Sequence, residues 1–245
     1  MLKPILLVCI VVLASTTAAS AQRGFAVDTI QTTGGPLKIT FIGHSSLMFS
    51  FNHKIIHIDP FSRVADYSKL PKADLILITH EHGDHLDPGA IAAVRGKETV
   101  VVCAEACVQT LPSSIVMKNG DTKTILGLQI QAVPAYNLIH KRENGQPFHA
   151  KGIGNGYIIT FGSQRVYIAG DTENTPEMKA LKNIDIAFLP MNLPYTMTPE
   201  MVADAARAFK PKILYPYHTG ETDPEELVDL LDDEPNIDVR IRKMP

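Results

Sequence analysis

The sequence predicts a single α/β domain in which two mixed β-sheets face each other and helices cover their outer surfaces. Short apolar or alternating segments recur from residue 37 to residue 241, and helix-start sequences lie between the later ones. No low-complexity linker divides residues 22–245. With 245 residues, 45% of them hydrophobic, the chain can bury a full core in one domain or in two tightly fused halves.

The predicted strands are short segments that are either continuously apolar or alternate between apolar and polar residues. Two connections, residues 51–54 and 161–165, are typical of hairpin turns, so we expect antiparallel pairing there. The predicted strands cover residues 37–42, 46–51, 54–58, 75–78, 99–102, 128–133, 157–161, 165–169, 184–189, 213–217 and 239–241.

The predicted helices begin with a capping side chain that is followed directly by proline. This pattern occurs at Asp87, Thr175, Thr198 and Asp223. Glutamates follow the last three prolines, where they complement the helix dipole. After Thr198, apolar residues recur at a spacing of four and are predicted to bury one helix face: Met201, Ala205 and Phe209.

Residues 1–21 are predicted to be a signal peptide. Lys3 provides a positive charge, residues 5–14 form a short apolar core, and Ala19-Ser20-Ala21 is a small-residue cleavage sequence. The apolar core is too short to favour a stable membrane span, although a retained N-terminal anchor is the alternative. We therefore expect an exported protein, periplasmic or extracellular, whose mature part is residues 22–245.

The balance of charge argues against a dedicated nucleic-acid-binding protein. The chain has 23 Lys and Arg against 26 Asp and Glu, and no basic run is interleaved with aromatic residues. A nuclease with a small basic loop stays an alternative, and a small-molecule substrate is the expected partner. The sequence makes no prediction of the oligomeric state.

Beyond the predicted signal peptide the chain has two cysteines, Cys103 and Cys107. An oxidising compartment permits a disulfide between them, but a spacing of four with helix-forming residues between favours two small buried thiols. We therefore predict structural cysteines, without the paired spacing of a zinc knuckle.

The sequence Thr-His-Glu-His-Gly-Asp-His at residues 79–85 has the spacing of metal ligands. Residues two apart in extended backbone point the same way, so His80 and His82 are predicted to hold one ion. Gly83 is expected to permit a sharp turn that brings Asp84 and His85 to a neighbouring position. Imidazole and carboxylate ligands together favour zinc, with manganese or iron as alternatives, over calcium or magnesium.

Two further possible ligands follow predicted strands. Asp171 ends the segment at 166–170, and His218 ends the segment at 213–217. Alone, Asp171 would be a common turn residue and His218 an ordinary core histidine. Because both follow strands that can end at a common rim, we predict that they join the cluster at residues 80–85.

The order of these residues, with Gly170-Asp171-Thr172 and then His218 after the histidine-rich segment, resembles the metallo-β-lactamase superfamily. The resemblance covers almost the whole of residues 22–245. It implies a four-layer αββα sandwich with a dinuclear site at one edge. It also implies that Asp171 bridges the ions and that His218 lies on the second ion beside Asp84 and His85.

Two shorter segments resemble one branch of that superfamily. Residues 43–46, Gly-His-Ser-Ser, and residues 58–61, Ile-Asp-Pro-Phe, are similar to the ascorbate-6-phosphate lactonase-like proteins and to relatives of N-acylphosphatidylethanolamine phospholipase D. These branch motifs are less specific than the superfamily motifs.

One position departs from the superfamily pattern. The family usually has a third histidine for the first ion in the loop after residues 128–133, where this chain has Asn137. His140 and His149 are the available substitutes. We favour His149, because Phe-His-Ala-Lys-Gly at 148–152 resembles a Phe-His-Pro-Lys-Gly segment of some relatives.

Several other residues have weaker predicted roles. Asp59 is expected either to orient a ligand histidine or to form an ordinary Asp-Pro turn. His44 is predicted to act on the substrate or to contact metal, with a strand-end histidine as the alternative. His53 and His57 are predicted to be structural, and Tyr195 either lines the pocket or packs within its loop.

The predicted function is hydrolysis by a metal-bound hydroxide held between two divalent ions. Neither a Gly-x-Ser-x-Gly elbow nor a His-Glu-x-x-His helix offers another route. Asp84 is a possible proton acceptor. Residues 137–151 contain several basic residues and Gly145, and Gly152 follows, which suggests a mobile flap for an anionic group. A solvated loop with ordinary charges is the alternative.

A small, anionic ester, lactone or amide is the first substrate hypothesis, and a phosphodiester is the second. A metal-binding or sensing protein without turnover is the rival from another class. Asn137, at the position of the usual histidine, is the feature that supports that rival.

Overall fold

The structure is a computed structural model that describes residues 24–244. The predicted signal peptide, residues 1–21, lies outside the described residues. Among residues 24–244, no helix combines the length and the apolar character needed to cross a membrane.

The first half of the described chain forms one seven-stranded sheet in which neighbours in sequence are neighbours in space. β1 to β4 pair antiparallel, whereas β4 to β7 pair parallel. The strands are β1 (Ala26–Thr32), β2 (Gly35–Gly43), β3 (Ser46–Phe51), β4 (Lys54–Ile58), β5 (Ala73–Ile78), β6 (Arg95–Cys103) and β7 (Ile115–Val116).

The second half repeats this topology in a second seven-stranded sheet. β8 to β11 pair antiparallel and β11 to β14 pair parallel. The strands are β8 (Thr122–Ile125), β9 (Leu128–Ala135), β10 (Gly154–Phe161), β11 (Gln164–Ile168), β12 (Ile186–Pro190), β13 (Ile213–Tyr217) and β14 (Asp238–Val239).

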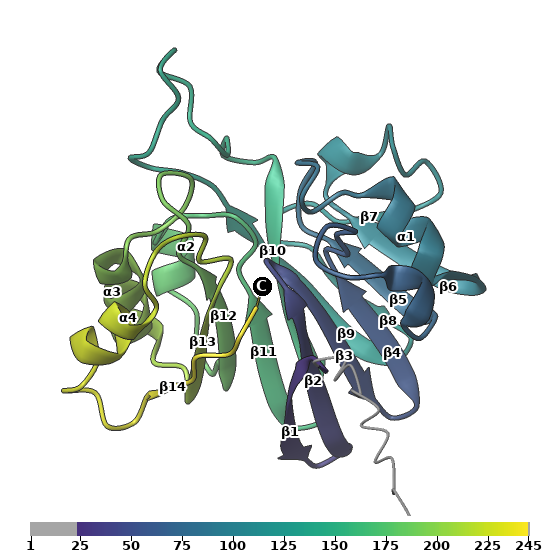
Figure 1. Cartoon of the computed structure of the whole chain (residues 1–245), viewed down its shortest axis with the longest axis horizontal. Coiled ribbons are helices and arrows are strands. Elements are labelled where there is room, and N and C mark those ends of the chain that lie inside the picture. The colour runs from purple at the N-terminus through teal and green to yellow at the C-terminus, as the bar shows by residue number, and fades with distance from the viewer. Residues whose placement is uncertain (1–23, 245) are drawn as a thin grey trace, which may run out of the picture.

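The helices cover the outer faces of the two sheets (Figure 1). α1 (Pro88–Val94) packs on the first sheet through Ile91 and Val94. α2 (Pro176–Lys179), α3 (Pro199–Phe209) and α4 (Glu225–Leu230) pack on the second sheet. Two 3-10 turns, Tyr67–Lys69 and Glu105–Cys107, complete the first half. A third apolar cluster lies between the sheets, so the predicted four-layer αββα sandwich is confirmed.

The predicted helix caps are confirmed at three of the four positions. Asp87, Thr175 and Thr198 each accept a hydrogen bond from a backbone N–H in the first turn. Asp223 was expected to cap α4, but Pro224 occupies the capping position. Asp223 instead accepts from the N–H of Glu225, which closes a local turn before the helix begins.

Three strands were missed by the sequence prediction: β1, β7 and β8. The strand predicted at residues 239–241 is also wrong in extent, because only Asp238 and Val239 pair with β13. Both described cysteines, Cys103 and Cys107, are free and buried, which confirms the prediction of structural thiols.

Candidate metal centre

The predicted site residues lie in loops at one end of both sheets. His80 to His85 follow β5, Asp171 follows β11 and His218 follows β13. Gly170 precedes Asp171 with φ of 66°, and a Cβ atom there would lie 2.9 Å from the carbonyl oxygen of Asn155. Only glycine fits this turn without strain.

Three histidines form the first group. One ring nitrogen from each of His80, His82 and His149 lies within 4.8 Å of the others. His80 and His149 are buried and His82 faces the pocket. The structure therefore brings His149, rather than His140, to this position: His140 Nδ1 lies 2.8 Å from the carbonyl oxygen of Thr196, outside the group.

A second group combines His44, Asp84, His85 and His218. His44 Nε2 lies 3.0 Å from Asp84 Oδ2, which in turn lies 3.7 Å from His218 Nε2. The backbone N–H of His218 donates to the carbonyl oxygen of His44 at 3.1 Å. This bond joins the loops that follow β13 and β2, which belong to different sheets.

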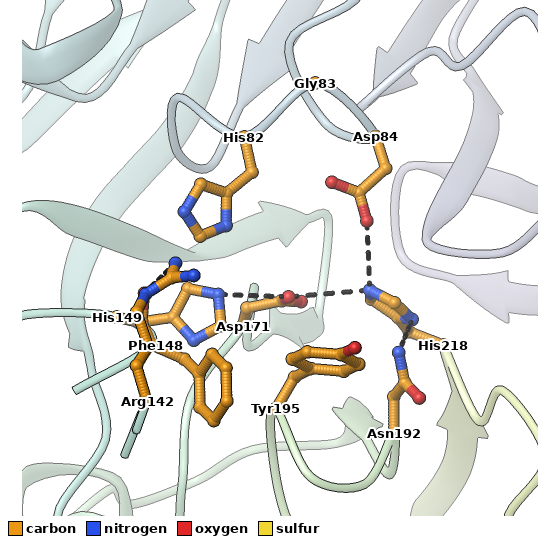
Figure 2. Close-up of a pocket in the computed structure, with 10 residues that line it drawn as sticks. All are labelled: His82, Gly83, Asp84, Arg142, Phe148, His149, Asp171, Asn192, Tyr195 and His218. Atoms are coloured by element: carbon orange, nitrogen blue, oxygen red, sulfur yellow. Dashed lines mark hydrogen bonds and ion pairs between the residues drawn. The ribbon is translucent and has the colours of Figure 1, made fainter. Parts of the chain in front are cut away.

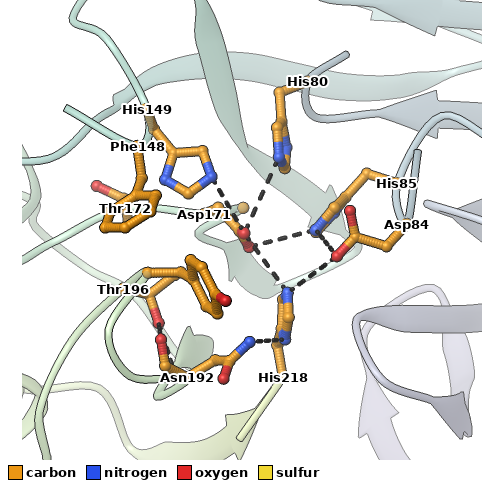
Figure 3. A network of polar contacts seen from close by, with 12 residues as sticks. His80, Asp84, His85, Phe148, His149, Asp171, Thr172, Asn192, Thr196 and His218 are labelled. Atoms are coloured by element: carbon orange, nitrogen blue, oxygen red, sulfur yellow. Dashed lines mark hydrogen bonds and ion pairs between the residues drawn. The ribbon is translucent and has the colours of Figure 1, made fainter. Parts of the chain in front are cut away.

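Asp171 lies between the two groups (Figure 3). Its Oδ2 atom is 3.3 Å from His149 Nε2 and 3.4 Å from His218 Nε2. Its Oδ1 atom is 3.4 Å from His85 Nε2, and Oδ2 is 3.9 Å from His80 Nε2. These separations are longer than hydrogen bonds of good geometry and leave room for a cation among the atoms.

Several of these buried atoms have no hydrogen-bond partner, namely His80 Nε2, His85 Nε2, His218 Nε2 and Asp171 Oδ1. An unpartnered buried polar atom is costly, and four such atoms on neighbouring side chains of one cluster call for bound ligands. Imidazole nitrogen and carboxylate oxygen are donors that zinc and similar ions accept. The residues present therefore fit divalent ions at this position.

Burial and neighbouring charges shift the pKa values of several residues of the cluster. Burial opposes ionisation of Asp171, but the nearby His218 and His85 hold its pKa well below its usual range. Burial lowers the pKa of His80 well below its usual value, whereas Asp171 and Asp59 raise the pKa of His85 well above it despite burial.

Asp59 supports one of these imidazoles directly. Its Oδ2 atom accepts from His85 Nδ1 at 2.8 Å, which leaves His85 Nε2 directed at Asp171. The N–H and hydroxyl of Thr79 donate to the same carboxylate at 2.8 and 2.7 Å. Asp59 has the environment of a carboxylate that fixes the orientation of a ligand histidine.

Asn137 orients His149 and does not itself enter the groups of ligand atoms. Its Oδ1 atom accepts from the backbone N–H and the Nδ1 of His149, at 2.7 and 2.8 Å. Its Nδ2 atom donates to Glu173 Oε1 at 3.0 Å and to the carbonyl oxygen of Tyr195 at 2.9 Å. The departure from the superfamily pattern therefore places an orienting amide where a ligand was expected.

Glu173 was missed by the sequence analysis. This fully buried carboxylate accepts three successive backbone N–H groups, from Leu138, Ile139 and His140, each at 2.7 Å. It also accepts from the side chain of Asn137. An acid two residues after Asp171 was the available signal, but nothing in the spacing identifies its partners.

The turn within the histidine-rich segment differs from the expected one. Gly83 is not in the left-handed region, and a Cβ atom there would meet nothing within 4 Å. The turn is closed instead by hydrogen bonds from the N–H groups of His85 and Leu86 to the carbonyl oxygen of His82. The expected turn at Gly83 is therefore present, but its backbone does not require glycine.

The remaining histidines lie away from the cluster. His53 occupies the turn between β3 and β4 with φ of 61°. His57 is buried in β4, where its Nε2 lies 3.1 Å from the carbonyl oxygen of Pro71. Both positions agree with structural roles.

The cluster opens into a cavity of about 440 Å³, the metal-facing cavity (Figure 2). His82, Asp84, His149, Asp171 and His218 line its metal-facing side. The rest of the lining comes from loops, namely Gly83, Arg142, Phe148, Asn192 and Tyr195. The cavity is large enough for a small-molecule substrate.

A family model described as a beta-lactamase superfamily domain matches residues 38–218. The chain belongs to the metallo-β-lactamase superfamily. A relative from Thermococcus onnurineus, named a UPF0173 metal-dependent hydrolase, is 33% identical over 220 residues, which cover 82% of this chain and 95% of the relative. A relative of the same name from Pelotomaculum thermopropionicum is 29% identical, over 84% of this chain and 96% of the relative.

Solved structures of the superfamily show the same fold. A protein from Parabacteroides distasonis, provisionally named a metal-dependent hydrolase, is 53% identical with a TM-score of 0.86, over 90% of this chain and all of that one. Igni18, a metallo hydrolase from Ignicoccus hospitalis, is 26% identical with a TM-score of 0.71, over 85% of this chain and 95% of that one. These homologues are named for the enzyme class that the sequence predicted.

Proposed function

We propose that the protein is an exported hydrolase that cleaves a small ester, lactone or amide at a site for two divalent ions. The observation that carries the proposal is the convergence of buried, unpartnered imidazole nitrogens and an Asp171 oxygen beside an open cavity. Zinc is the proposed metal, with manganese and iron as alternatives. When bound, such ions lower the pKa of water and polarise a carbonyl or phosphoryl oxygen.

The protein's own side chains divide these tasks. The proposed ligands form two sets that share Asp171, namely His80, His82 and His149 for one ion and Asp84, His85 and His218 for the other. Asp84 is the most exposed of the carboxylates in the cluster and reaches the cavity, so it is also the proposed proton acceptor. His44, 3.0 Å from Asp84, is proposed to hold that carboxylate in place and to donate to the substrate.

The segments that resemble the lactonase-like branch both contribute to this site. Residues 43–46 bring His44 to Asp84, and residues 58–61 bring Asp59 to His85. Because the branch contains both lactonase-like proteins and relatives of a phospholipase D, this resemblance is compatible with a lactone and with a phosphodiester, and we propose an ester or lactone first. A phosphodiester is the alternative that the same experiment tests.

The test is metal analysis of the purified protein, followed by hydrolysis assays with an ester, a lactone and a phosphodiester. We expect bound metal, hydrolysis that a chelator abolishes, and a loss of at least about 1000-fold in kcat/KM for Asp171→Ala. Hydrolysis that survives both treatments would refute the proposed chemistry. Bound metal without hydrolysis of any of the three would favour a metal-binding protein.

The proposed export has a separate test. Expression of the full chain with its own N-terminus, followed by N-terminal sequencing of the protein outside the cytoplasm, should find Gln22 as the first residue. Intact Met1 on protein recovered from the cytoplasm would contradict export.

A further inference from the structure

The flap formed by residues 137–151 has an ordered base and an exposed tip. Its base is held by Glu173, which accepts the N–H groups of residues 138–140. At its tip, Arg142 and Gln146 pair through their backbones, and the N–H of Gly145 donates to the carbonyl oxygen of Arg142. In Figure 1 the segment between β9 and β10 stands away from the sheets. The tip is thus presented by a defined hairpin.

Among residues 24–244, Arg142 is the one lysine or arginine that lines the metal-facing cavity. Its guanidinium carbon lies 5.1 Å from the centre of the Phe148 ring, and its Nη2 atom donates to the carbonyl oxygen of Phe148 at 3.4 Å. No carboxylate of the described chain forms an ion pair with it. A guanidinium held by an aromatic ring keeps most of its donors free for an oxyanion.

An aromatic wall continues from Arg142 along the cavity. The rings of Phe148 and Tyr195 meet edge to face at 5.0 Å between centroids, and both residues line the cavity. Figure 2 shows these rings along one side of the cavity and Asp84 and His82 along the other. Tyr195 is fixed by its backbone, whose carbonyl oxygen accepts from Asn137 Nδ2.

We propose that Arg142 binds a carboxylate or phosphate of the substrate, and that an apolar spacer lies against Phe148 and Tyr195 between this anion and the group that is hydrolysed. The inference rests on the proposed function and names its substrate class: an anionic ester, lactone or amide with an apolar spacer. A planar guanidinium matches the two oxygens of such anions. Arg142 also supplies a positive charge, whereas the carboxylates of the proposed metal ligands are negative.

The test compares three esters with one leaving group. These are 4-nitrophenyl hexanoate, mono-4-nitrophenyl adipate and the 4-nitrophenyl ester of 5-phosphonopentanoic acid, which end in a methyl group, a carboxylate and a phosphonate. We expect the metal-loaded protein to prefer an anionic ester by about 10- to 100-fold in kcat/KM, the range of one charged hydrogen-bonded pair. The better of the two anions distinguishes carboxylate from phosphate recognition.

Arg142→Gln should raise KM for the two anionic esters far more than for the hexanoate and so remove this preference. Arg142→Lys should restore part of it. Lys141→Gln is the matched control, because it removes the same charge from the neighbouring residue, which does not line the metal-facing cavity. Equal losses for all three esters, or an unchanged preference, would overturn the proposal.

A binding measurement separates this inference from the proposed chemistry. If the metal-loaded protein hydrolyses none of the esters, the proposed function fails in this assay, and calorimetric titration with adipate and with 5-phosphonopentanoate decides the role of Arg142. We expect Arg142→Gln to weaken binding of one of these anions by about tenfold or more and Lys141→Gln to leave it unchanged. Equal affinities for both variants, or no binding of either anion to the unsubstituted protein, would refute recognition by Arg142.

Discussion

Replacement of Glu173 by glutamine tests whether one buried carboxylate orders both the flap, residues 137–151, and the first histidine group, His80, His82 and His149. The side chain is fully buried, and its two oxygens accept the N–H groups of Leu138, Ile139 and His140 and the amide of Asn137. Glutamine keeps the shape but replaces one of these oxygens with an NH₂ group. Whichever oxygen is replaced, at least two donors then face another donor.

The magnitude follows from the number of donors that lose their acceptor. Each unsatisfied buried donor costs about 1–3 kcal/mol, and the flap base is only partly buried, so we expect a loss of about 2–4 kcal/mol in the free energy of unfolding. If the NH₂ group takes the place of Oε1, the amide of Asn137 loses its acceptor. If it takes the place of Oε2, Leu138 and Ile139 lose theirs, and they directly follow Asn137 in the chain. Because Asn137 orients His149, metal affinity should fall by about tenfold.

The assay is urea unfolding in the presence of a chelator, followed by metal titration of the folded protein. Glu177→Gln is the matched control: it makes the same change four residues later, where a partly exposed carboxylate contacts Tyr136 and Lys151. That variant should lose less than about 1 kcal/mol and keep its metal affinity. Equal stability losses, together with unchanged metal affinity in Glu173→Gln, would refute the reasoning.

Asp59→Asn should lower metal affinity by about 10- to 100-fold, because the substitution disturbs the hydrogen bond that orients His85. Competition with a fluorescent chelator measures the affinity, and an unchanged value would contradict the prediction. Burial lowers the pKa of His57 from 6.5 to about 4, so the unfolded chain takes up the proton first and stability falls as pH falls through that window. Between pH 7 and pH 5 the unsubstituted protein should lose about 2 kcal/mol more than His57→Gln in urea unfolding, and parallel losses would rule this out. Gly156→Ala should lower the free energy of unfolding by at least about 2 kcal/mol, because its Cβ would lie 2.7 and 3.0 Å from two backbone oxygens. Gly96→Ala is the control: its Cβ would meet only ordinary contacts, so its stability should stay within about 0.5 kcal/mol of the unsubstituted protein.

The inner strands and helix starts of the fold were predictable, because buried strands require apolar runs and helix starts require caps. Residues 75–78 of β5 and the whole of β12, for example, are buried and form continuous apolar segments. β1 and β8 were not predictable in this way. They lie at sheet edges, and polar residues such as Asp28 and Thr124 occupy much of their length, so apolar periodicity is weak.

The site was predictable where ligands are close in sequence and follow strands. His80 to His85, Asp171 and His218 all lie where strand ends meet, so strand position alone places them at one rim. The contacts of Asn137 and Glu173 were not predictable from spacing. A polar residue in a loop can serve many partners, and the one it finds depends on how distant loops pack.

The repeated topology of the two sheets has a consequence for assembly. Residues 26–116 supply every strand of one sheet and residues 122–239 supply every strand of the other. Asp171 and His218 therefore come from one half of the chain, and His80 to His85 come from the other. Each half carries only part of the proposed set of metal ligands. Tight binding of a metal ion therefore requires the two halves to be packed together. If the chain is divided within residues 117–121, the two fragments should associate more strongly when zinc is added, because the ion binds ligands from both.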